Sequence, residues 1–168
     1  MADNIETTLT EISINNQQTK ESKMKNIYTM SETELLYAIL WETTDVVAAL
    51  IDQGADINKK NKRGETALMI AIEDGDARLA YILIEKGANV NEKNGETTAL
   101  MLASARNYDC IVTKLIEKGA KLDETDENGE TALDFVDRVP QDDIYNWYPD
   151  PAKTRSVLLK AGAKSGDS

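Results

Sequence analysis

The chain has 168 residues, 41% of them hydrophobic, which is enough for one domain with a hydrophobic core. Its formal charge of -11 argues against nucleic-acid binding, because that binding needs Lys and Arg to replace the cations around the phosphates. It has no histidine, which is the usual general base of hydrolase triads and a usual ligand of zinc. Its one cysteine, Cys110, cannot form a disulfide within the chain.

No apolar run approaches the roughly 20 residues that cross a bilayer. The N-terminus has neither the basic start nor the apolar segment of a signal peptide. We therefore expect a cytoplasmic protein that does not associate with a membrane. Residues 1–24 are polar and lack a sustained period, which predicts a flexible tail ahead of a folded domain at 25–168.

Two short motifs recur along the folded part. The first is Thr-x-Leu, beginning at Thr33, Thr66, Thr98 and Thr131. The second is a Gly-Ala pair, beginning at Gly54, Gly87, Gly119 and Gly162. A nearly constant spacing of 32 or 33 residues, broken only before Gly162, predicts a repeat architecture.

Each repeat has the pattern of two helices. In the first, Ser31 and Glu34 have the spacing of a capping box, which predicts a helix from about Thr33. A second helix is expected over 45–53, and Gly54 stands where a left-handed residue ends a helix. A polar loop then leads to the next repeat.

This pattern resembles the ankyrin repeat. The family pattern is a loop glycine, Thr-Pro-Leu-His, Ala-Ala, and Val-x-x-Leu-Leu-x-x-Gly-Ala-Asp-Val-Asn. The second repeat matches it at Gly64, Thr66, Leu68, Ala71, Leu83, Ile84, Gly87, Ala88, Val90 and Asn91. The resemblance implies an all-α, ankyrin-repeat solenoid of four helix-turn-helix repeats with short hairpin-like loops. The repeats would span about 28–58, 59–91, 92–123 and 124–164.

Three departures from the family pattern are informative. No repeat keeps the proline or the histidine of the tetrapeptide, which suggests modest stability. The loop before Thr98 is one residue short, so its shape should differ from its neighbours. In the fourth repeat, ten extra residues separate Thr131 from Leu158, around 140–151, and all three prolines fall there. We expect a stiff, irregular loop.

The family binds other proteins through a concave face and its loop tips, so the resemblance implies no catalytic, cofactor-binding or metal residues. The corresponding loop tips carry Lys62, Arg63, Glu65, Asn94, Glu127 and Asn128. The ends of the first helices carry Leu40, Trp41, Glu73, Asp74, Arg106 and Arg138. The insertion adds the aromatic residues Tyr145, Trp147 and Tyr148.

Two alternatives stay open for the aromatic residues. Trp41 either covers the apolar first helix or contacts a partner. Tyr145, Trp147 and Tyr148 either seal the C-terminal end of the stack or form a second contact patch.

The resulting hypothesis is a non-catalytic protein-interaction module, without cofactor, that binds a protein with a basic surface. The alternative is an acidic inhibitor or immunity-type protein that occludes a toxin or nuclease. Nucleic acid and membrane are not expected as partners. We expect a monomer, with a homodimer through the first repeat as the other arrangement.

Overall fold

The computed structural model describes residues 44–137 and 150–166, which all belong to one compact unit, Leu35–Ser168. The predictions for the N-terminal tail, for the first helix of the first repeat and for most of the insertion lie outside these residues. The elements in chain order are α3 (Thr44–Asp52), α4 (Ala67–Glu73), α5 (Ala77–Glu85), β1 (Lys93–Asn94), β2 (Thr97–Thr98), α6 (Ala99–Ala105), α7 (Asp109–Glu117), the 3-10 helix η1 (Asp134–Asp137) and α8 (Pro151–Ala161).

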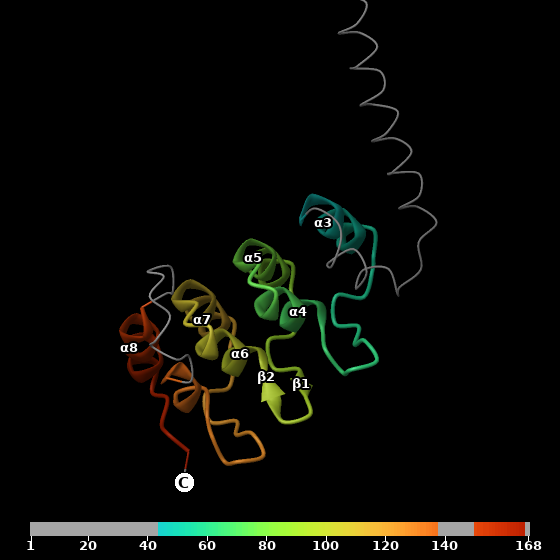
Figure 1. The fold of residues 1–168 in the computed structure, drawn as a ribbon. Helices are drawn as coiled ribbons and strands as arrows, with labels where there is room; N and C mark the ends of the chain where they lie inside the picture. Colours follow the sequence, from blue (N-terminus) through green and yellow to red (C-terminus); the bar gives the residue numbers. More distant parts are fainter. Residues whose placement is uncertain (1–43, 138–149, 167–168) are drawn as a thin grey trace, which may run out of the picture. The chain divides into compact units, whose positions relative to one another are not determined.

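The helices form two layers (Figure 1). In one layer α4 packs on α6 and α6 on η1, and in the other α3 packs on α5, α5 on α7 and α7 on α8. Between the layers, α4 packs on α5, α6 on α7 and η1 on α8. The α4–α5 and α6–α7 pairs are helix-turn-helix units of the predicted kind, and the described part of the chain is mostly helical with one small two-stranded sheet.

Side chains and glycines set the ends of the helices where the repeat pattern predicts them. The Thr66 and Thr98 hydroxyls accept hydrogen bonds from the backbone amides of Met69 and Met101, which caps α4 and α6. Gly54 follows α3 with a φ of +97°, a left-handed conformation that a Cβ would strain. The recurring threonine and glycine are therefore start and stop signals of the helices.

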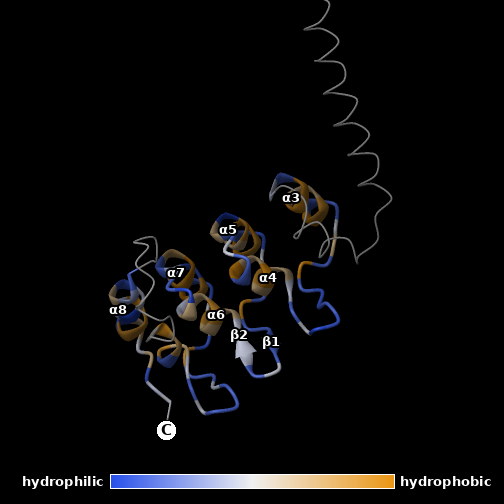
Figure 2. Ribbon diagram, viewed as in Figure 1, coloured by the Kyte–Doolittle hydropathy of each residue, from blue (hydrophilic) through white to orange (hydrophobic). Residues whose placement is uncertain are grey.

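The core lies between the two layers. Its fully buried large side chains come from both layers, and they include Leu68, Leu83, Leu100, Leu115 and Leu158. Figure 2 shows that the hydrophobic faces of the helices are turned toward one another, while the connecting loops are hydrophilic. The leucines of the repeat motif therefore stabilise the packing between repeats as well as within them.

The loop before Thr98 differs from its neighbours, as its missing residue predicts. It is a tight antiparallel hairpin in which Lys93 pairs with Thr98 and Asn94 with Thr97. Gly95 is the first of the two turn residues and has a φ of +59°, a position that favours glycine in such hairpins. The loop before Thr66, one residue longer, forms only an isolated bridge.

The predicted fourth repeat begins differently from the second and third. Its described first-helix residues form a 3-10 helix, η1, in place of a full α-helix turn. The irregular insertion ends earlier than predicted. Pro151, which the sequence pattern assigns to it, is the first residue of α8, and Asp150 caps that helix. Proline suits this position, since the first helical residue needs no amide donor. Among the described helices, none is long and apolar enough to cross a bilayer.

Candidate functional site

The loop that precedes α4 is held by the side chain of Asn61. Its carbonyl oxygen accepts hydrogen bonds from the backbone amides of Arg63 and Glu65, at 2.8 and 3.0 Å. Its amide group donates to the Glu65 carboxylate at 2.8 Å, and Arg63 forms an ion pair with the same carboxylate at 2.8 Å. The loop is therefore fixed from within, while Lys62 and Arg63 remain exposed.

Glu65 does not lie at a loop tip, where the repeat pattern predicts it. It was expected at an exposed loop tip, but the structure leaves only 3% of the residue exposed. The turn directs the carboxylate back onto Asn61, where it satisfies the loop's own donors. Glu65 therefore acts as a support that orients Arg63.

The ends of α4 and α6 bring further predicted residues together. The Arg106 guanidinium follows α6 and donates to the backbone carbonyl of Glu73 at 2.5 Å. Asp74 is the exposed residue directly after α4. Residues from two repeats therefore meet at one edge, which we call the α4 edge and define by Arg63, Glu65, Glu73, Asp74 and Arg106.

Electrostatic interactions join these residues. Partial burial raises the pKa of Glu73, and the nearby Glu65 carboxylate raises it further. Arg63 and Arg106 act in the opposite direction, and Asp74 adds to the increase. The α4 edge is therefore one electrostatic unit of three carboxylates and two guanidinium groups.

The other described candidates lie in separate loops. Asn94 occupies the hairpin, and its side-chain oxygen would be 2.8 Å from a Cβ added at Gly64, so it packs against the loop before α4. Glu127 and Asn128 are exposed in the loop after α7, where Asp126 accepts the Asn128 amide. Their binding roles stay predictions, as do those of the candidates outside the described residues: Leu40, Trp41, Arg138, Tyr145, Trp147 and Tyr148.

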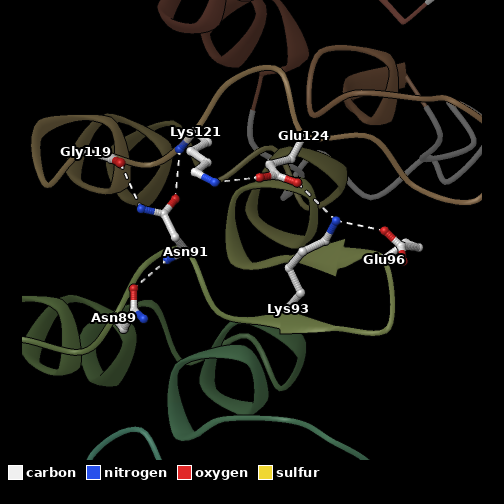
Figure 3. A network of polar contacts seen from close by, with 7 residues as sticks. All are labelled: Asn89, Asn91, Lys93, Glu96, Gly119, Lys121 and Glu124. Atoms are coloured by element: carbon white, nitrogen blue, oxygen red, sulfur yellow. Dashed lines mark hydrogen bonds and ion pairs between the residues drawn. The ribbon is translucent and has the colours of Figure 1, made fainter.

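A polar network between repeats was not predicted (Figure 3). The Asn91 side chain donates to the carbonyl of Gly119 at 3.0 Å and accepts from the amide of Lys121 at 2.9 Å. Asn58, one repeat earlier, accepts the amide of Asn89 in the same way, at 2.8 Å. An asparagine stands four residues after the glycine of each of the first two Gly-Ala pairs, and this recurrence was a signal that could have indicated these bridges.

Charged side chains reinforce this network. Lys93 forms ion pairs with Glu96 at 2.8 Å and with Glu124 at 3.0 Å (Figure 3). Glu124 also pairs with Lys121 at 3.0 Å. Hydrogen bonds from both lysines lower the pKa of Glu124, so it stays ionised to a lower pH than an ordinary glutamate. The hairpin is thus tied to the loop of the following repeat.

Asn58 and Asn91 each connect their repeat to the next one. At the equivalent position of the third repeat the chain has Asp123, and this connection is missing among the described residues. A carboxylate can accept a hydrogen bond but, when ionised, cannot donate one to a carbonyl. No bond from Asp123 is found among the described residues, and an open hollow of about 740 Å³ lies there. Its walls include Leu122, Asp123, Thr125, Gly162 and Lys164.

We expect the change Asp123→Asn to stabilise the protein. An asparagine at this position has a side-chain amide that can donate to a backbone carbonyl, as that of Asn91 does. One added hydrogen bond contributes about 1 kcal/mol. For a chain of this size, that raises the melting temperature by about 2–4 °C. Thermal unfolding followed by circular dichroism measures it, with Asp123→Ala as the control that removes the carboxylate alone. An equal shift in both variants would show that only the loss of charge matters.

The described residues contain no group of acidic or cysteine side chains arranged to hold a metal ion. Cys110 lies near the start of α7 and is exposed.

A family model for ankyrin repeats, in three copies, matches residues 8–94 and 35–126, most of the chain. The chain belongs to the ankyrin repeat family. Members of this family are generally non-catalytic modules that mediate protein-protein interactions.

The chain is also similar to a Transient receptor potential cation channel subfamily A member 1 homolog from Caenorhabditis elegans. The two are 27% identical over 110 residues, which is 66% of this chain but only 9% of the channel homolog.

Proposed function

We propose that this protein is a cytoplasmic, monomeric interaction module that binds a partner protein through the concave face and loop tips of a four-repeat ankyrin stack. The repeats span about 28–58, 59–91, 92–123 and 124–164, after a tail of residues 1–24. The partner presents a basic surface, and the α4 edge is the part of the binding face that the described residues define best.

The observation that carries this proposal is a contrast between the two helix layers. In the layer of α3, α5, α7 and α8, which we call the second layer, acidic side chains pair with lysines of neighbouring repeats. Asp52 pairs with Lys86, and Glu85 pairs with Lys114 and Lys118. At the α4 edge, Glu73 and Asp74 form no ion pair within the described residues. Their negative charge is therefore available to a positively charged partner.

Charge reversal in each layer tests the proposal. Asp74→Lys changes the α4 edge at an exposed position, and lysine is favourable at a helix C-terminus. Glu117→Lys makes the same change of charge on α7, in the other layer. Each variant is used as bait in an extract of the native source, and the captured proteins are compared with those of the wild type.

We expect Asp74→Lys to lose proteins that both the wild type and Glu117→Lys retain. Capture should also weaken as salt rises from about 0.05 to 0.5 M, because exposed charges are screened over a Debye length of about 10 Å at 0.1 M. Capture that is the same for all three baits would contradict the proposed surface. Capture that is insensitive to salt would contradict a basic partner.

A further inference from the structure

Glu73 occupies a position that is unfavourable for a carboxylate. It is the last residue of α4, where the helix dipole is negative, and the last turn contains no basic residue. The side chain is partly buried and lies near a second carboxylate, that of Glu65. Both features oppose ionisation of Glu73 in the free protein.

The fold does not need an acidic residue at this position. In the next repeat, the equivalent last residue of α6 is Ala105, and α6 has the same length and the same threonine cap as α4. The contact of Arg106 with Glu73 uses the backbone carbonyl, which any residue supplies. The Glu73 carboxylate is therefore dispensable for the stack.

The neighbouring cations do not neutralise Glu73 directly. Arg63 is paired with Glu65 at 2.8 Å, and Arg106 is bound to the carbonyl. The charged groups that act on Glu73 are Glu65, Arg63, Arg106 and Asp74, so the α4 edge has three negative and two positive charges. One added cation would balance it.

We infer that the Glu73 carboxylate anchors a guanidinium or ammonium group of the partner protein, which takes the place of the missing cation at the α4 edge. This rests on the proposed function and assigns the central contact of that surface to one residue. The bound cation relieves the repulsion between Glu73 and Glu65 by pairing directly with the Glu73 carboxylate, which neither Arg63 nor Arg106 does.

The same contact makes binding depend on pH. Because the pKa of Glu73 is raised from its ordinary value of 4.5, this carboxylate gains its proton at a higher pH than an ordinary glutamate. The protonated acid no longer attracts a cation, so affinity falls as pH decreases through that raised pKa. The folding stability of the free protein changes in the opposite direction. Because the raised pKa means that the folded state disfavours the ionised carboxylate, protonation of Glu73 stabilises the free protein as pH decreases.

The test uses the full chain with a fluorescent oligo-arginine peptide at low salt. Glu73→Gln removes the anchoring charge, and Glu117→Gln removes one charge from the other layer as a matched control. We expect Glu73→Gln to weaken the peptide about tenfold, equivalent to about 1.4 kcal/mol, and Glu117→Gln to weaken it less than twofold. Equal weakening by both would show that the peptide senses net charge alone, which overturns the anchor.

Two further measurements separate a binding role from a structural one. Glu73→Gln should unfold at the same or a higher temperature than the wild type, and it should lose the early decrease in affinity as pH falls. A lower melting temperature with unchanged affinity overturns the inference. If Asp74→Lys abolishes capture of the partner while Glu73→Gln has no effect, only the anchor fails; if neither variant has an effect, the proposed binding surface fails as well.

Discussion

Replacing Leu83 with alanine is expected to lower the free energy of unfolding by about 2–5 kcal/mol, the usual cost of emptying a buried leucine site. Leu83 lies in α5 and is fully buried. Because α5 packs against α3, α4 and α7, the cavity weakens contacts within its repeat and with both neighbours. Chemical denaturation followed by circular dichroism measures the loss.

Leu159→Ala is the matched control for this change. Leu159 lies in α8, also a second-layer helix, but 53% of the residue is exposed. Exposed substitutions away from special features usually change stability by about 0.5 kcal/mol or less. A loss at Leu159 as large as that at Leu83 would contradict the arrangement of the two layers.

The second large effect is expected at Asn91, whose side chain connects two repeats. Asn91→Ala removes one donated and one accepted hydrogen bond, which should destabilise the protein by about 1–2 kcal/mol. Asn91→Asp keeps the acceptor for Lys121 and loses the donor for Gly119, so about half of that loss is expected. Denaturation in about 0.5 M salt limits the effect of the added charge.

The two Asn91 variants also test why no such connection forms at Asp123, which we attribute to the lack of a hydrogen-bond donor in its carboxylate. If Asn91→Asp is as stable as the wild type, the donated bond contributes nothing. The absence of a donor at Asp123 would then fail to explain the hollow beside it. A full loss in the Asp variant would instead show that the donated bond is the dominant one.

The repeat pattern predicted the helices well because their signals are local. Thr66 and Thr98 cap helices through amides three residues away, and Gly54 ends a helix through its own φ angle. The short loop before Thr98 was also predictable, since a missing residue changes the turn geometry directly. Such features depend on neighbours in the chain.

The burial of Glu65 was not predictable in this way. An acidic residue in a polar loop is usually exposed, and only the turn closed by Asn61 directs its carboxylate inward. The start of α8 at Pro151 was missed for a related reason, because a proline can belong to a loop or begin a helix. Both outcomes depend on the surrounding structure.

By itself, the sequence determined the family, the repeat unit, the helix caps and the glycines that end the helices, since these follow from residue types at fixed spacing. The tertiary structure decided which charges meet. It placed Arg106 of one repeat on Glu73 of the previous one and Asn91 against Gly119 and Lys121 of the next. The physical reason is that partners about 30 residues apart are brought together only when the repeats stack. The chemistry of the α4 edge is therefore a property of the stack and not of any single repeat.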